Sequence, residues 1–116
     1  MTSSQDHVDY LADIAEAMAK AQQFVSGMSF EAFAMDDKTV FAVIRALEIV
    51  GEAAKRIPDS FRDQYPEIPW RSMAGMRDKS VYGYSGINLK VVWKTVTEEL
   101  PPLEGSILRV LADQRD

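Results

Sequence analysis

Apolar residues recur every three or four positions along most of this chain, which is the spacing typical of amphipathic helices. The first such stripe predicts a helix over residues 5–26, ended by Gly27. A second helix is predicted over residues 38–56, with Asp37 as its N-cap. This second segment is apolar on nearly all sides, so it belongs at the centre of a bundle. The apolar positions of the first stripe are Leu11, Ile14, Met18, Ala21 and Val25.

The chain then becomes rich in proline and glycine before the helical pattern resumes. We expect a third helix over residues 69–82, with Pro69 at its first position and Gly83 or Gly86 at its end. Its inward side chains are expected to be Trp70, Met73, Met76 and Val81. A glycine in the middle of a helix is unfavourable, so Gly75 indicates a place where another backbone approaches closely.

The last part of the chain predicts two further helices. Asn88 is the expected cap of the first, which the Pro101–Pro102 pair ends or kinks, and the second covers residues 102–113. Short helical turns are expected near residues 29–33 and 59–65, and no strand pattern or repeat is visible. The sequence therefore predicts an all-α fold, an up-down bundle of four to five helices in a single domain, residues 1–116.

Composition is that of a folded protein, with 47% apolar and 27% charged residues. There is no cysteine, which excludes disulfides and thiolate metal sites and fits a reducing compartment. The first residues lack the basic and apolar pattern of a signal peptide, and no apolar run approaches the roughly 20 residues that span a bilayer. We therefore expect a cytoplasmic protein without a membrane partner.

Charge is unevenly distributed along the chain. Residues 55–94 hold eight Lys/Arg and four Asp/Glu, a net charge of +4. The remaining residues hold five basic and fourteen acidic side chains, a net charge of −9, so the whole chain carries −5. The basic segment is either a solvated helix face or a contact for an anion such as phosphate.

A narrow polar stripe interrupts the apolar second helix. It contains Arg45, Glu48, Glu52 and the Lys55–Arg56 pair, spaced three or four residues apart. One interpretation is a set of charge pairs on a strip of exposed surface. The other is that the stripe lines a groove or a subunit interface, since buried charges persist only when they are paired.

Most catalytic constellations are missing from the sequence. The single histidine, His7, lies near the N-terminus and is expected to be a surface residue. No cluster has metal-ligand spacing, and no glycine-rich phosphate loop or nucleophile elbow occurs. What remains is the segment MRDKSVYGYSGIN (76–88), which ends a predicted helix with two tyrosines around a glycine.

The surrounding sequence resembles a known family. AVIRALEIVGEAAKRIP (42–58) and YPEIPWRSMAGMRDKSVYGYSGINLKVVW (65–93) are similar to the HepT-like branch of the HEPN superfamily, and the resemblance covers nearly the whole chain. It implies an all-α homodimer that acts on RNA as a metal-independent ribonuclease toxin and needs no cofactor. It also implies a partner, an MNT-type nucleotidyltransferase antitoxin.

The family signature is an arginine, four to six residues, and a histidine, commonly with a tyrosine two positions later. The resemblance makes Arg77 the motif arginine and Tyr84 the tyrosine to which the antitoxin attaches AMP. The position of the motif histidine is occupied by Tyr82, which is the departure that matters. The expected supporting polar residues are Arg45, Glu48, Asp78 and Lys79.

The spacing and the substitution have physical consequences. Five residues at roughly 100° each place Arg77 and Tyr82 about 140° apart on a straight helix. They converge only if the helix unwinds near Gly83 or if a second copy meets the first across a two-fold axis. Arginine can stabilise the phosphorane, but a tyrosine with an ordinary pKa of about 10 is a poor base at neutral pH. We therefore expect an RNA-capable cleft with weakened cleavage.

Three origins of Tyr82 remain open: an introduced inactivating change, a natural inactive relative, or an enzyme that uses tyrosine inefficiently. Two other classes of function also remain open. One is a non-catalytic dimeric module that partners a nucleotidyltransferase or binds RNA or nucleotide. The other is a helical interaction bundle in which Arg77, Tyr82 and Tyr84 have only structural roles.

Overall fold

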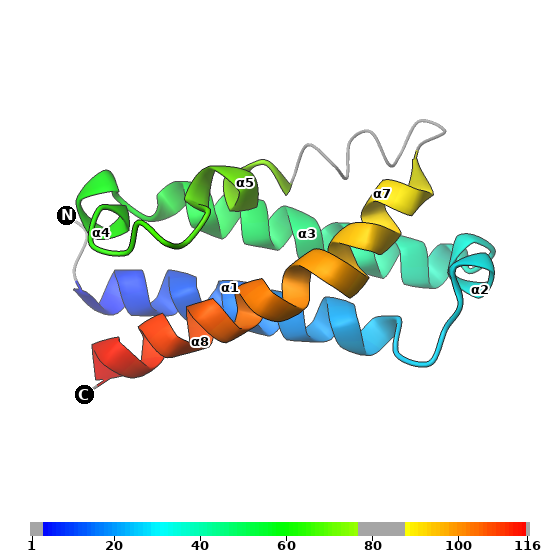
Figure 1. Ribbon diagram of the computed structural model, residues 1–116, viewed down its shortest axis with the longest axis horizontal. Coiled ribbons are helices and arrows are strands. Elements are labelled where there is room, and N and C mark those ends of the chain that lie inside the picture. Colours follow the sequence, from blue (N-terminus) through cyan, green and yellow to red (C-terminus); the bar gives the residue numbers. More distant parts are fainter. Residues whose placement is uncertain (1–3, 77–87, 116) are drawn as a thin grey trace.

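Three long helices form the body of the computed structural model, which describes residues 4–76 and 88–115. They are α1 (Ser4–Phe24), α3 (Asp37–Arg56) and α8 (Leu100–Arg115). α1 packs against both α3 and α8, and α3 and α8 each run antiparallel to α1 (Figure 1). The shorter elements are α2 (Phe30–Ala34), α4 (Asp59–Arg62), α5 (Trp70–Ala74), α7 (Leu89–Lys94) and the π-helical turn η1 (Thr95–Glu99).

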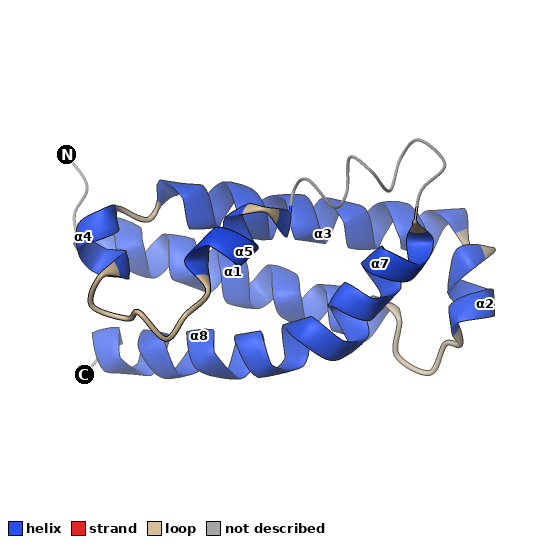
Figure 2. Cartoon of the chain, turned by 45° about the horizontal axis from the view of Figure 1, so that its top comes forward, coloured by secondary structure: helices blue, strands red, loops and turns tan. Residues whose placement is uncertain are grey.

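Every element of the described chain is helical, and loops join the elements (Figure 2). The predicted all-α bundle is therefore confirmed. None of the helices within residues 4–76 and 88–115 is both long and apolar enough to cross a membrane.

The core follows the predicted stripes. All five apolar positions predicted for the first helix are buried, and so are Trp70, Met73 and Met76 after the proline-rich connection. The α3 residues that complete this core include Val43, Leu47, Val50 and Ala54, and the α8 residues include Ile107, Val110 and Leu111. Val81, the other predicted core residue of that segment, lies outside the described residues.

The helix ends follow capping rules, with one correction. Gly27 has a φ of 78°, the left-handed conformation that glycine adopts most easily after a helix. The N-cap of α3 is Asp36 and not Asp37, because Asp36 has the non-helical backbone of a cap while Asp37 is already helical. Asp36 Oδ1 accepts a hydrogen bond from the Thr39 N–H at 3.1 Å, and this bond lowers the pKa of Asp36.

The Asp36 cap predicts a pH dependence of stability. Because the pKa of Asp36 is lowered in the folded state, its stabilisation is fully present above the ordinary pKa of aspartate and is lost as pH falls through the lowered value. Asp36→Asn keeps a capping oxygen but does not titrate. We expect thermal unfolding midpoints of the unaltered chain to fall more steeply with acidification than those of Asp36→Asn. Parallel curves would exclude Asp36 as the source.

The connection after α4 differs from the expected long helix. Pro69 is the N-cap of α5 and not its first helical residue, and Gly75 is its C-cap, which suits the low helix propensity of glycine. A side-chain carbon on Gly75 would meet only the carbonyl oxygens of Arg71 and Ser72, both at 3.5 Å. The expected close approach of another backbone, as from a second copy of the chain, therefore stays a prediction. The rest of the predicted helix, from residue 77 to its end at Gly83 or Gly86, lies outside the described residues.

The last two predicted helices form one continuous helical path. α7 passes through η1 into α8, and the path bends between α7 and α8 (Figure 1). The Leu100 N–H donates to the Thr95 carbonyl five residues earlier, which is the wide π-type bond. The helix therefore bends before Pro101 and does not end there. Pro101 has no N–H for a regular α-helical bond, and the widened turn lies just before it. Asn88 lies at the N-cap of α7 as expected, but its side chain makes no capping hydrogen bond.

Candidate functional site

The predicted catalytic segment lies between two described parts of the chain. Arg77, Asp78, Lys79, Tyr82 and Tyr84 all fall within residues 77–87, outside the described residues. The residues that flank this segment are described. Met76 is buried in the core, and α5 before it packs on α3. Asn88 is exposed at the start of α7, which packs against α2 and η1.

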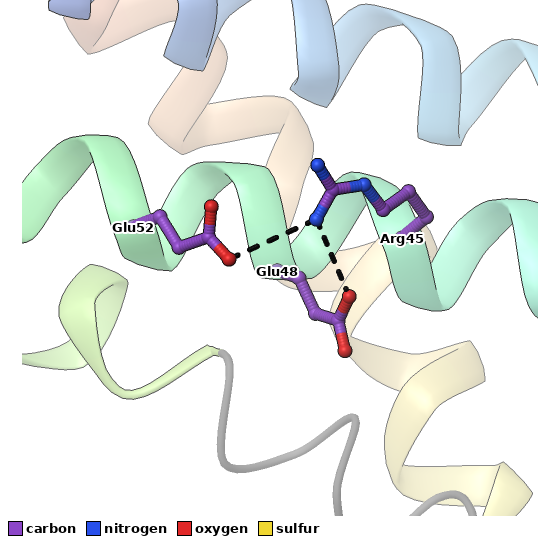
Figure 3. A network of polar contacts seen from close by, with 3 residues as sticks. All are labelled: Arg45, Glu48 and Glu52. Atoms are coloured by element: carbon purple, nitrogen blue, oxygen red, sulfur yellow. Dashed lines mark ion pairs between the residues drawn. The ribbon is translucent and has the colours of Figure 1, made fainter.

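The polar stripe of α3 forms an ion-pair network. Arg45 Nη1 lies 3.5 Å from Glu48 Oε1 and 3.7 Å from Glu52 Oε1. Figure 3 shows one guanidinium nitrogen of Arg45 facing both carboxylates. Glu48 lies about one helical turn further along α3, and Glu52 about two turns. This arrangement confirms the charge-pair interpretation. Since the Arg45 side chain is 61% exposed, the network contributes little to stability and leaves the arginine accessible to solvent.

The same stripe also borders a groove. A cavity of about 190 Å³ lies between α1 and α3, with Arg45, Glu52 and Arg56 on one wall. Its remaining lining residues are Tyr10, Asp13, Ile49 and Ala53. Three residues of the stripe therefore line a groove, and a functional role for this groove stays a prediction. A drug-sized ligand needs roughly 300–1,000 Å³, so this groove fits only a small polar group or a side chain.

Sequence reasoning missed Tyr10 and Asp13 as parts of this groove. They lie three residues apart on α1 and so project on one face, beside the predicted stripe of α3. That spacing was the available signal. It could not reveal the groove, because the contact between α1 and α3 is a tertiary one.

The basic segment serves more than one purpose. Arg62 Nε donates to the Ile57 carbonyl at 2.9 Å, and Arg62 Nη2 donates to the Ala54 carbonyl. Arg62 therefore satisfies carbonyl groups at the C-terminal end of α3 and has a structural role. The other described cations of this segment are exposed, namely Lys55, Arg56, Arg71, Lys90 and Lys94.

His7 is not the surface residue that its position near the N-terminus predicted. Its ring packs against Phe61 with centroids 5.2 Å apart and an interplanar angle of 60°. Its Nε2 atom is buried and has no hydrogen-bond partner within the described part of the chain. The reason is a tertiary contact, because the first turns of α1 pack against Phe61 of α4, which the sequence pattern does not show. Among the described residues no group of three or more potential metal ligands is present.

The class of protein follows from the fold and the family match together. The chain is an all-helical, HEPN-like bundle. A family model described as "Ribonuclease HepT-like" matches residues 14–110, which include the whole segment from Arg77 to Tyr84. The chain belongs to the HepT-like ribonuclease family.

Relatives in other organisms cover nearly the same length. A protein of Thermococcus cleftensis named "Probable ribonuclease HepT" is 54% identical over 101 residues, 87% of this chain and 92% of the relative. A protein of Caldanaerobacter subterraneus named "Putative RNase TTE0752" is 38% identical over 106 residues, 91% of this chain and 95% of the relative. No solved structure matches the chain.

Proposed function

We propose that this chain is the ribonuclease toxin of a HEPN/MNT toxin–antitoxin system, a single cytoplasmic domain that acts as a homodimer. The observation that carries the proposal is the family match over residues 14–110, because the matched span contains the whole segment from Arg77 to Tyr84, with Tyr82 at the histidine position. The substrate is RNA, which is cleaved without a metal ion in a cleft at the dimer interface. Cleavage by this chain is weakened because Tyr82 stands at the histidine position.

The proposed chemistry divides between two side chains. Cleavage requires the 2′-hydroxyl to lose a proton, the leaving 5′-oxygen to gain one, and the phosphorane charge to be stabilised. Arg77 supplies a fixed cationic fork for the phosphorane. Tyr82 can donate a hydrogen bond to the leaving oxygen but is a poor base, because the ordinary pKa of tyrosine is about 10. A direct test is RNA cleavage by the Tyr82→His variant.

The supporting residues have narrower proposed roles. Asp78 and Lys79 follow Arg77 directly and would adjust the charge around the cleft. Arg45 and Glu48 belong to the ion-pair network of α3, the helix against which α5 packs just before the motif. Both would act by orienting charge near the substrate and not by transferring protons.

Tyr84 is proposed as the site at which the antitoxin neutralises the toxin by adding AMP. Incubation with the cognate nucleotidyltransferase, ATP and Mg²⁺ is expected to transfer an adenylyl group to the tyrosine oxygen with release of pyrophosphate. The mass of the chain should rise by that of AMP less one water, and peptide mapping should place the addition on Tyr84. The matched control is Tyr84→Phe, which removes only the acceptor oxygen. Equal labelling of the Tyr84→Phe variant would exclude this residue as the acceptor.

A second function is favoured by Tyr82 itself. Without a base that works at neutral pH, the same dimer could be a binding module that partners a nucleotidyltransferase or holds RNA or nucleotide without cutting it. Such a module would still take AMP on Tyr84, but it would not gain cleavage when histidine is placed at position 82. The Tyr82→His variant therefore separates the two functions.

A further inference from the structure

Lys90 lies on an aromatic support that joins α2 to α7. Its Nζ lies 5.5 Å from the centroid of the Phe30 ring. The Phe30 ring meets Trp93 edge-on, with centroids 6.2 Å apart, and Trp93 packs on Phe33 at 5.3 Å. Phe33 is fully buried, so the support extends into the core and limits where the lysine can lie.

This lysine differs from the cations that the structure neutralises. Lys20 pairs with Glu16 at 2.9 Å, and Arg45 pairs with two glutamates. Lys90 and Lys94 form no ion pair with any described residue, although Glu98 lies four residues after Lys94. A cation–π contact attracts an ammonium group without cancelling its charge. Lys90 thus keeps its capacity to bind an anion.

The two lysines share one exposed face. Residues four apart on a helix have Cβ atoms about 5–6 Å apart, so the exposed side chains of Lys90 and Lys94 start from the same face of α7. Two cations on one face can each contact a phosphate of the same nucleic-acid strand, and each contact adds to the attraction for that strand. α7 contains no acidic residue that would oppose such a contact.

The position of α7 in the chain points to the same partner. Lys90 follows Tyr84, the last residue of the proposed motif, by six positions in the sequence. A strand held in the cleft must continue beyond the cleaved bond, and α7 follows the motif closely in the sequence. The protein as a whole carries a charge of −5, so local cations have to supply the attraction for a polyanion.

We infer that Lys90 and Lys94 form a subsite for the phosphate backbone of single-stranded RNA, with Phe30 as the residue that positions Lys90. This inference rests on the RNA-cleaving function proposed above. It adds a binding surface outside the catalytic motif, one that holds the strand by charge and does not read its sequence. Phe30 acts only through Lys90 and is not a catalytic residue.

The test measures binding apart from cleavage. The probe is a fluorescein-labelled single-stranded RNA with 2′-O-methyl groups, which cannot be cut by attack of its own 2′-oxygen. Affinity is measured by fluorescence anisotropy over a series of KCl concentrations. Each phosphate contact on a single strand contributes about 0.7 to the slope of log affinity against log salt. The Lys90→Gln/Lys94→Gln variant is expected to lose about 1.4 of that slope.

The same variant is expected to bind the probe up to about fivefold more weakly for each lysine removed, as for an exposed charge pair. Lys90→Arg/Lys94→Arg keeps both charges and should keep the slope. Lys20→Gln/Lys55→Gln removes the same total charge from α1 and α3 and should also keep most of it. Thermal unfolding of each variant separates lost binding from lost folding.

Two results would overturn the inference, and they can be told apart. A normal slope in Lys90→Gln/Lys94→Gln would leave the lysines with only the structural task of joining α2 to α7, and the nuclease proposal would stand. Failure of the unaltered chain to bind the probe at any salt concentration would overturn both the subsite and the RNA-directed function.

Discussion

Replacing Tyr82 by histidine is expected to increase RNA cleavage about 10²–10⁴-fold, the usual contribution of general acid–base catalysis. Histidine has an ordinary pKa near 6.5, so a useful fraction is a free base at neutral pH and the remainder is an acid. Tyrosine is almost wholly protonated under the same conditions. The measurement is the rate of cleavage of a labelled RNA in the presence of EDTA, because the proposed reaction needs no metal ion.

The matched control is the double variant Tyr82→His/Arg77→Ala. If Arg77 stabilises the phosphorane, its removal should cost the histidine variant about 10²–10³ in rate, the range found when one oxyanion-stabilising donor is removed. Growth arrest on expression should follow the same order as cleavage. The nuclease proposal is wrong if Tyr82→His stays inert while binding RNA no better than Arg77→Ala does.

The sequence predicted the main helices because their apolar residues recur at helical spacing. Leu11, Ile14 and Met18 repeat at helical spacing, and all three are fully buried. Local details were harder to predict. The chain offers two adjacent aspartates before α3, and the choice of Asp36 over Asp37 depends on which of them leaves the helical backbone conformation. That conformation depends on how α2 connects to α3.

The bend before α8 shows a second limit. Pro101 excludes a regular α-helical bond at its own nitrogen, and this is compatible with a helix end or with a distorted turn. The structure takes the distorted turn, since Val96 within the turn and Leu100 directly after it are fully buried and keep the path against the core. Burial of these side chains is a tertiary effect that the prolines alone do not reveal.

The candidate site was predictable to different degrees in its different parts. The spacing of Arg45 and Glu48 predicted an ion pair, and the pair is present. The additional pairing of Arg45 with Glu52, seven residues away, depends on the side-chain conformation of the arginine. The support of Lys90 by Phe30 joins residues sixty positions apart in the sequence, so no local pattern could have indicated it.

Replacing Phe33 by alanine is expected to lower the free energy of unfolding by about 3–5 kcal/mol. Phe33 is fully buried and its ring packs on Trp93, so truncation removes apolar contacts and leaves a cavity between α2, α3 and α7. A domain of this size is stable by only about 5–15 kcal/mol, so the loss is a large share of the total. The measurement is the midpoint of urea unfolding followed by circular dichroism.

The control for Phe33 is Phe24→Ala, the same chemical change at the end of α1. Phe24 is 41% exposed, and its replacement should change the free energy of unfolding by only about 0.5 kcal/mol. Equal destabilisation by the two substitutions would contradict the assignment of Phe33 to the core. If Phe33→Ala remains folded at low temperature, it also tests the aromatic support, because Trp93 and Phe30 then lose the buried ring beneath them and Lys90 is less firmly placed. Its affinity for the 2′-O-methyl RNA should then fall, while that of Phe24→Ala should not.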